Sequence, residues 1–414
     1  LEGTGKARLL VDGEVLVEEI GKPNDSERLS SGEHEFVVEY ESPASGDAQL
    51  RLSWEERDFD KEPVPRSAFT YLPGNEALGV HATLRMGRTL VAEKRCTACH
   101  EAPVDIARPE LTLKAASLDG VGDRLRQDWM AKWIADPSSL RPSSHMPAVF
   151  KEDAEQKAAH VAAYLAQGAA EIDEGVKIEE GAVARGGHTF AEQGCIACHS
   201  IDGSQDADRI DLKAVGKKFR HGALAAFLRE PAKFHEATRM PTFGFDEKES
   251  TELEAFLRSL EADPGAAIPA GDPAKGKELF LSSGCVECHT REDATSTFTK
   301  GAPLTELRGA DCGEVRYAFA EPDLDKASLA AFLQDPGAGA SLGRAVPAEF
   351  ADRQYAALNC NACHARDGET PLRDVHAEAV AKYKRPEPET DEEKPALKGG
   401  APPLDYLGYK LRPE

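Results

Sequence analysis

One short pattern recurs four times in the 414-residue chain and limits what the chain can fold into. In each copy two cysteines stand two residues apart and a histidine follows at once, and the copies hold eight of the nine cysteines. We number the copies motifs 1 to 4 in chain order. They are Cys96-Thr97-Ala98-Cys99-His100, Cys195-Ile196-Ala197-Cys198-His199, Cys285-Val286-Glu287-Cys288-His289 and Cys360-Asn361-Ala362-Cys363-His364.

Covalent haem attachment is the chemistry that needs this spacing. The two thiols become thioethers to the porphyrin vinyl groups, and the adjacent histidine lies under the iron as proximal ligand. Structural zinc sites also use paired cysteines, but they need no histidine directly after each second cysteine. A disulfide framework fits poorly, because this long chain has little cysteine outside the motifs. The sequence therefore predicts four haem c groups, with His100, His199, His289 and His364 as proximal ligands.

Two of the four methionines stand where a second iron ligand is expected. Met146 and Met240, each followed by proline, come 46 residues after His100 and 41 residues after His199. A thioether is a soft axial ligand that favours ferrous iron and raises the redox potential. We therefore expect Met146 to be the distal ligand of the first haem and Met240 that of the second.

The chain around the motifs repeats as well. A helix with glycine and an apolar residue three positions later precedes each of the first three motifs, and a closing amphipathic helix follows the first two methionines. This order resembles the class I cytochrome c fold over residues 78–168 and 178–262. In that family the first and last helices cross where a glycine permits close approach and so enclose the haem. The pairs before the motifs are Gly87/Leu90, Gly187/Phe190 and Gly276/Leu279, and the closing helices carry Tyr164-Leu165 and Phe256-Leu257.

The third repeat lacks its methionine. Alignment with the first repeat puts Val346 at the position of Met146, and valine has no lone pair to offer iron. The third haem is therefore expected to be five-coordinate or to take another ligand. The alternatives are Cys312, a lysine, Tyr317, a water, or a histidine from elsewhere such as His376. Cys312 is otherwise a buried apolar residue or an intermolecular disulfide partner.

The fourth repeat follows closely on the third. Only 13 residues separate Val346 from Cys360, so the third and fourth repeats are expected to share a helix and their haems to form a compact pair. The sequence ends at Glu414, where the helix before a distal ligand would begin, so the sixth ligand of the fourth haem is expected in residues beyond it. The acidic run 387–393 is typical of a solvated loop.

The first 75 residues differ in kind. Alternating apolar and polar residues at 7–11, 14–17, 35–40 and 49–54 predict antiparallel strands. Val11-Asp12-Gly13, Ser31-Gly32-Glu33-His34 and Leu50-Arg51-Leu52-Ser53-Trp54 resemble the C-terminal half of a PA14 β-sandwich, a family whose members are extracellular and in several cases bind carbohydrate. Three prolines between Phe59 and Gly79 predict a linker.

The predicted fold class is mainly α, with cytochrome c-like domains in tandem behind an N-terminal antiparallel β-sandwich fragment. The expected divisions are 1–75 for the β fragment, 76–175 for the first cytochrome c domain, 176–265 for the second, 266–350 for the third and 351–414 for a truncated fourth.

Composition restricts the partners. The net charge of −23 argues against binding to nucleic acid or to an anionic membrane and favours a basic redox partner. Apolar runs are far shorter than the roughly 20 residues that cross a bilayer. The sequence begins at Leu1 without a leader, so a secretory signal was removed or lies outside it. Because haem of this type is attached after export, we expect a periplasmic or extracellular location.

The leading functional hypothesis is a tetrahaem c-type cytochrome that passes electrons between redox partners outside the cytoplasm. The alternative is a peroxidase-like enzyme that uses an open site on the third haem. No histidine of that repeat supplies a distal acid or base, and no catalytic residue is predicted. The β module could tether the cytochrome to a polysaccharide or to another subunit.

Overall fold

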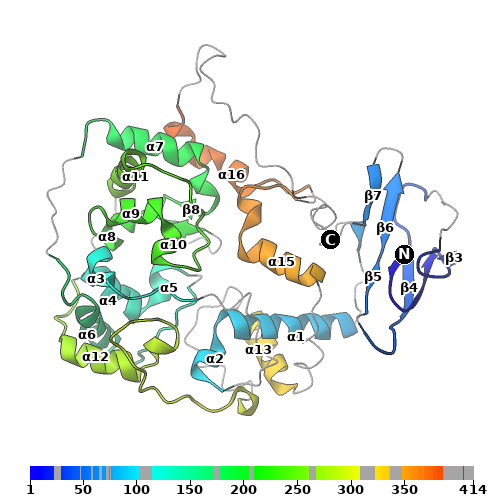
Figure 1. The fold of residues 1–414 in the computed structure, drawn as a ribbon, viewed down its shortest axis with the longest axis horizontal. Helices are drawn as coiled ribbons and strands as arrows, with labels where there is room; N and C mark the ends of the chain where they lie inside the picture. The colour runs from blue at the N-terminus through cyan, green and yellow to red at the C-terminus, as the bar shows by residue number, and fades with distance from the viewer. Residues whose placement is uncertain are drawn as a thin grey trace. The chain divides into compact units, whose positions relative to one another are not determined.

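The computed structural model describes most of the chain and shows two compact units (Figure 1). Residues 1–73 form the β unit, and nearly all of the remaining chain forms the helical unit. The described residues are 1–22, 29–46, 48–56, 59–64, 68–70, 74, 76–101, 114–142, 144–170, 178–204, 209–260, 267–307, 322–335, 347–366, 368–385 and 404.

The β unit consists of small antiparallel sheets. The largest has the strand order β3-β2-β4, and two-stranded sheets are made by β1 with β5 and by β6 with β7. Alternation along β2 buries Leu9 and Val11, which pack with Val17 of β3. The strands are β1 Glu2–Gly3, β2 Lys6–Val11, β3 Glu14–Val17, β4 Phe36–Glu41, β5 Leu50–Arg51, β6 Ser53–Glu56 and β7 Phe59–Pro63.

The strands expected at 7–11, 14–17 and 35–40 are present within one residue of their predicted ends, whereas the strand expected at 49–54 is divided into β5 and β6, which belong to different sheets. The prediction of a linker from Phe59 to Gly79 is wrong at both ends. Phe59–Pro63 is a strand whose Pro63 pairs with Ser53, and Gly79 lies inside the first helix. Prolines misled the prediction because proline is tolerated at the end of an edge strand. The PA14-like sandwich stays a prediction.

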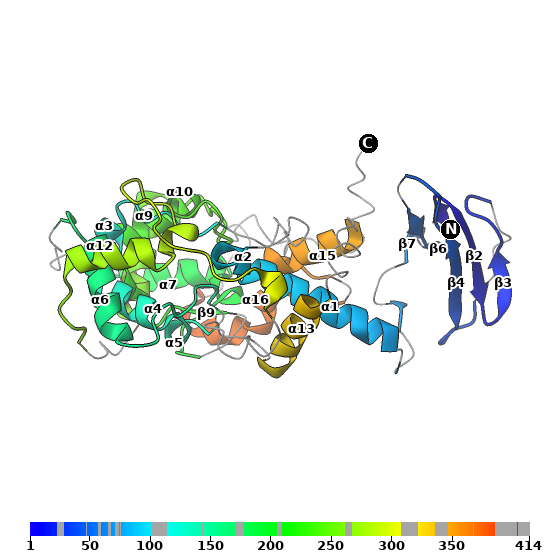
Figure 2. The same cartoon turned by 90° about the horizontal axis from the view of Figure 1, so that it is seen from below.

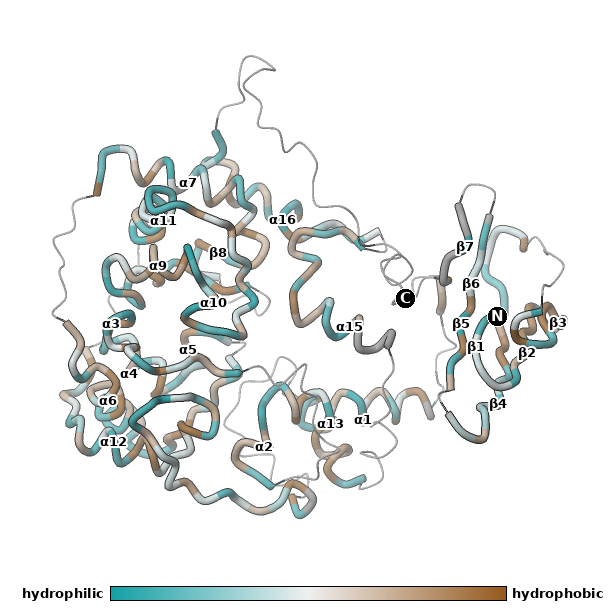
Figure 3. Tube along the Cα trace, viewed as in Figure 1, coloured by the Kyte–Doolittle hydropathy of each residue, from teal (hydrophilic) through white to brown (hydrophobic). Residues whose placement is uncertain are grey.

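The helical unit is built of amphipathic helices, which carry both hydrophilic and hydrophobic stretches in Figure 3. Within the described ranges, none of them combines the length and the apolar character needed to span a bilayer. The longer helices are α1 Glu76–Glu93, α4 Gln127–Ala135, α6 Ala154–Leu165, α7 Ala182–Glu192, α9 Ala223–Arg229, α11 Glu247–Ser259, α12 Pro273–Ser282, α13 Pro322–Gln334 and α15 Pro347–Ala357. The shorter ones are α2 Cys96–Cys99, α3 Val121–Arg124, α5 Pro137–Leu140, α8 Val215–Lys218, α10 Pro231–Phe234 and α16 Leu372–Val375.

Local sequence fixes where several helices begin. The Asp272 carboxylate accepts hydrogen bonds from the amides of Ala274 and Lys275, and Pro273 occupies the first turn of α12. At α11, Asp246 and Glu249 form a reciprocal capping box. These side chains satisfy amides that the first turn of a helix leaves without partners.

The helices before and after motif 2, α7 and α11, cross each other. Helix α7 packs on α11, and a Cβ atom on Gly186 would overlap the backbone carbonyl of Glu252. The rings of Phe190 and Phe256 meet there, and both are buried. The predicted glycine was Gly187, one residue away, which faces the rings of Phe256 and Tyr383 instead.

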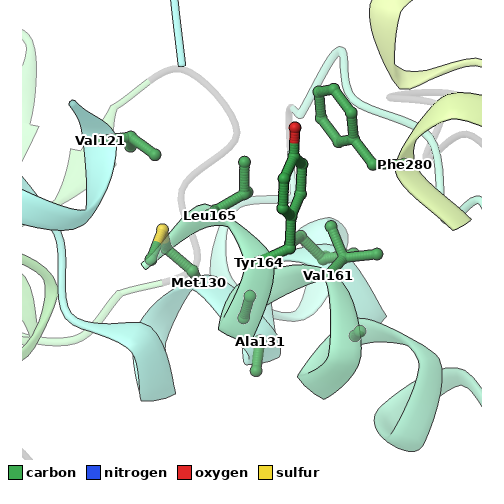
Figure 4. Packing of buried hydrophobic residues seen from close by; sticks show 10 residues of the cluster. Val121, Met130, Ala131, Val161, Tyr164, Leu165 and Phe280 are labelled. Atoms are coloured by element: carbon green, nitrogen blue, oxygen red, sulfur yellow. The ribbon is translucent and has the colours of Figure 1, made fainter. Parts of the chain in front are cut away.

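The other two crossings join helices that are far apart in sequence. Helix α12 packs on α6, where Gly276 lies against the carbonyl of His160 and Phe280 packs on Tyr164 (Figure 4). Helix α1 packs on α13, where Gly87 lies against the carbonyl of Ser328. Both helix pairs lie side by side in Figures 1 and 2.

These pairings correct the predicted tandem order. The closing helix expected for the first domain, α6, packs on the opening helix of the third repeat, α12. The boundaries at 175 and 266 therefore do not separate these two helical cores. The apolar pattern of a helix shows that it has a buried face but not which helix covers that face.

The α1–α13 crossing predicts a specific glycine requirement. Gly87→Ala should lower the free energy of unfolding by about 1–3 kcal/mol, because its Cβ would meet backbone that no rotamer change can move. Gly79→Ala, in the same helix with open space around it, should leave stability unchanged or raise it by up to ~1 kcal/mol. Denaturant titrations of both variants followed by circular dichroism make the comparison. Equal effects would contradict the crossing.

Candidate functional site

The four motifs share one local conformation. Each begins a short helical turn, namely α2, η3 Cys195–Ala197, η4 Cys285–Glu287 and η7 Cys360–Ala362. The residue before each first cysteine has a left-handed backbone, with φ 54°, 69°, 85° and 56° at Arg95, Gly194, Gly284 and Asn359. Glycine and asparagine favour this conformation, whereas arginine is strained in it. Sequence reasoning missed this shared turn, although the glycines and the asparagine were a usable signal.

The histidines of motifs 1 to 3 are held in the same way. Each Nδ1–H donates to a backbone carbonyl: His199 to Ile210 at 3.2 Å, His100 to Ala302 at 2.7 Å and His289 to Ala116 at 2.8 Å. A donor fixed at Nδ1 leaves the lone pair on Nε2, the atom that a metal would bind. Backbone acceptors cannot be read from side-chain patterns, so these three carbonyls could not be predicted from the sequence.

The electrostatic surroundings favour uncharged sulfur and nitrogen. Burial lowers the pKa of His199 to about 4 and also lowers that of His289, which keeps both rings neutral at pH 7. Burial raises the pKa of Cys195 and of Cys285 to about 12, which opposes a thiolate. A zinc site or a reactive dithiol needs thiolates, whereas a thioether carries no charge. The site is therefore suited to covalently attached haem.

The remaining cysteine geometry agrees. No disulfide joins the eight motif cysteines. Over the described part of the chain, no three histidine, cysteine or acidic side chains gather as they would around a metal ion.

Two partly buried cations, Lys218 and Arg141, lie close to motif 2. Burial, together with the charge of Arg141, lowers the pKa of Lys218 to about 8, and both cations depress the pKa of His199. The Lys218 ammonium also stands 4.8 Å from the ring centre of Trp129. Two positive charges held close together create a positive potential that favours a bound anion. The propionates of haem are anions of the required kind.

The two predicted ligand methionines lie in different cores. Met240 is in the core that contains Cys195, as expected for motif 2. Met146 is in the core that contains Cys285 of motif 3, not in the core of Cys96. The prediction that places Met146 at the first haem and leaves the third without methionine therefore disagrees with the packing. Sequence order suggested it, because Met146 follows motif 1.

Motif 4 lies beside motif 2. The Asn359 amide is 3.3 Å from the Sγ of Cys198, and Arg239 donates to the carbonyl of Ala357 at 3.0 Å. After motif 4 the chain packs on η3, and the carbonyl of Tyr383 in η8 Ala377–Tyr383 accepts from His188 at 2.6 Å. The predicted compact pair of motifs 3 and 4 is therefore wrong.

Motif 1 lies beside motif 3 through an equivalent contact. The Nδ1 of His145, which precedes Met146, donates to the carbonyl of Glu93 at 3.0 Å. Arg239 likewise precedes Met240, and Glu93 and Ala357 each stand three residues before a motif. The segment after motif 3 also reaches motif 1, where Lys300 donates to the carbonyl of Thr97 at 3.1 Å and the Gly301 amide to that of Cys99 at 2.8 Å.

Some predicted site residues lie outside the described residues, namely Cys312, Tyr317, Val346 and the acidic run 387–393. His376, offered as a ligand for the third haem, lies between α16 and η8, in the segment that packs beside motifs 2 and 4. The structure does not bring it to motif 3.

Comparisons with known proteins identify part of the helical unit. The family model of cytochrome c matches residues 183–261, which include α7, motif 2 and α11. A cytochrome c of Theileria annulata is 37% identical over 59 residues, which are 14% of this chain and 50% of that protein. The chain thus spans about half the length of this curated relative. No solved structure matches the chain.

Residues 183–261 are therefore a cytochrome c domain, a kind of domain that carries covalently bound haem. The match begins at residue 183, so the resemblance of residues 78–168 to this family rests on the residues quoted for it.

The cytochrome c domain depends on one buried carboxylate. Glu254 accepts hydrogen bonds from the amides of Gly222 and Ala225 at the start of α9 and from Arg258 at 2.7 Å. Glu254→Ala should lower the free energy of unfolding by about 3–5 kcal/mol, because it removes the carboxylate that pairs with the charge of the partly buried Arg258 and leaves two amides of α9 without their acceptor. Denaturant unfolding measures the change. Glu247→Ala, on the exposed side of the same helix, is the control, and a similar loss there would contradict the assignment.

Proposed function

We propose that the chain is a tetrahaem c-type cytochrome that carries electrons between redox partners outside the cytoplasm. The observation that supports this most strongly is the contact between motifs, 1 with 3 and 2 with 4, within a single compact unit. Attached haems supply one-electron redox couples, and attachment sites in contact keep such couples close.

The two pairs of motifs are joined by backbone hydrogen bonds. The Arg126 amide donates to the carbonyl of Lys218 at 3.0 Å, and the Arg220 amide to that of Arg124 at 2.9 Å. The aromatic contact of Lys218 with Trp129 crosses the same junction. These contacts join the core that contains Cys285 of motif 3 to the core that contains Cys195 of motif 2.

The cysteines, histidines and methionines would have different roles in holding the haems. The cysteine pairs would hold the haems covalently, so that no carrier dissociates, and the motif histidines would bind the irons through Nε2. Met146 and Met240 would supply soft sulfur ligands that favour the ferrous state. Trp133 donates its indole N–H to the Met146 sulfur at 3.0 Å and holds that side chain in place.

The charge and the β unit suggest how the cytochrome meets its partners. A net charge of −23 favours a basic docking protein and an association rate that falls as salt rises. The β unit has a small core of its own and would tether the cytochrome to a polysaccharide or to another subunit. We expect a periplasmic or extracellular location, because haem is attached to such motifs after export.

The haem count tests the proposal directly. The mature protein should have the mass of the polypeptide plus four haems, and Cys360→Ala with Cys363→Ala should carry three. Intact-protein mass spectrometry and a pyridine haemochrome assay measure both. A protein with one haem, attached at Cys195 and Cys198, would reduce the chain to a single cytochrome c domain.

The hydrogen bond to the Met146 sulfur predicts a redox effect. Because this bond withdraws electron density from the ligand, Trp133→Phe should lower one midpoint potential by about 20–60 mV, the equivalent of a bond worth about 0.5–1.5 kcal/mol. Spectroelectrochemical titration measures it. Trp129→Phe is the control, since Trp129 stacks on Trp133 but Trp133 donates the bond. Equal shifts in both variants would mean that only ring packing matters.

A further inference from the structure

The cytochrome c domain shows how one continuous stretch of chain completes a motif. All of its parts lie within residues 178–260: the opening helix α7, motif 2, Met240 and the closing helix α11. The ring centres of Phe190 and Phe256 are 5.4 Å apart at the crossing, and the Leu212 amide donates to the carbonyl of Ser200 at 2.8 Å. These contacts give a pattern against which the other motifs can be compared.

Motif 3 has the same set of contacts, but its partners come from the chain that follows motif 1. The ring centres of Phe280 and Tyr164 are 5.6 Å apart where α12 crosses α6. His289 donates to Ala116, and the Leu118 amide donates to the carbonyl of Thr290 at 2.9 Å. Met146 stands in this core as Met240 stands in the other.

Polar contacts reinforce this pairing. The Asp272 amide donates to the Nδ1 of His160 at 2.8 Å, and the Tyr164 hydroxyl donates to the Asp293 carboxylate at 3.1 Å. The Glu292 amide donates to the Asp119 carboxylate at 2.9 Å. These bonds join residues 112 to 173 positions apart, so each would be lost if motif 3 were completed by the chain that follows it.

Motif 1 has the reciprocal arrangement. His100 donates to Ala302, and the Leu304 amide donates to the carbonyl of Glu101 at 2.8 Å. Leu304, which lies shortly after motif 3, and Phe332, which lies in α13, are buried in the core against which Cys96 packs. The chain that follows motif 3 therefore completes motif 1.

We propose that motifs 1 and 3 have exchanged the segments that complete them. Given the proposed function, Met146 is the distal ligand of the iron attached at Cys285 and Cys288, and motif 1 is the site without a methionine. The sequence after α13 carries Val346 at the aligned position, and valine offers no lone pair. The site with a vacant or unusual sixth ligand is therefore that of His100 rather than that of His289.

The near-infrared charge-transfer absorption of methionine-ligated ferric haem tests the exchange. Met146→Leu should halve this absorption per protein. Cys96→Ala with Cys99→Ala should remove one haem by mass and leave the absorption unchanged, because motif 1 has no methionine. Adding Met146→Leu to that variant should reduce its absorption to half of the wild-type value. Met86→Leu, a partly exposed methionine on α1, is the control and should change nothing.

The opposite result overturns the proposal. If removing the haem of motif 1 itself halves the absorption, and Met146→Leu then adds no further loss, Met146 serves motif 1. A wild-type protein with fewer than four haems by mass would defeat the proposed function instead, so the two failures are distinguishable.

A second variant covers the case in which the Cys96 and Cys99 variant does not fold. Cys285→Ala with Cys288→Ala should remove one haem and halve the absorption, and Met146→Leu should then have no effect. Full absorption in this variant would equally overturn the exchange.

Discussion

Close helix crossings at glycine are the constraint on which the helical unit depends. At Gly186, Gly276 and Gly87 the backbone of a second helix takes the place that a Cβ would fill. Each crossing fixes the helix that leads into a motif, and the left-handed residue and helical turn that follow set the direction of its histidine. The position of the motif histidine is thus decided by backbone contacts nine residues before the first cysteine.

The proposed exchange between motifs 1 and 3 ties the two sites together mechanically. Two tandem domains could separate at a linker, whereas two sites that each contain the other's completing segment cannot part without breaking both cores. The hydrogen bonds of His145 and Arg239 then tie each methionine loop to the helix before the neighbouring motif. Such coupling keeps the sites of a pair at a constant separation, as the proposed electron transfer between them would require.

The sequence predicted the motifs, the strands and the buried helix faces better than it predicted which helices pack together. Covalent chemistry requires cysteine spacing and an adjacent histidine, so the four motifs were readable directly, and alternation located the strands of the β unit. Burial of Tyr164, Leu165, Phe256 and Leu257 also followed from helical periodicity. The partner of α6 did not, because α12 offers it the same apolar face and glycine that α1 does. Backbone acceptors such as Ala116 and Ala302 have no sequence signature, and Met146 was assigned by order along the chain rather than by packing.

A double-mutant cycle between Tyr164 and Phe280 tests the helix pairing most directly. The account predicts that Tyr164→Ala and Phe280→Ala are coupled in unfolding free energy by about 0.5–1.5 kcal/mol, as expected for rings in contact. Tyr164→Ala and Val91→Ala, the pair that a sequential first domain would bring together, should be additive. Additivity for Tyr164 with Phe280, combined with coupling of Tyr164 to Val91, would contradict the exchanged arrangement.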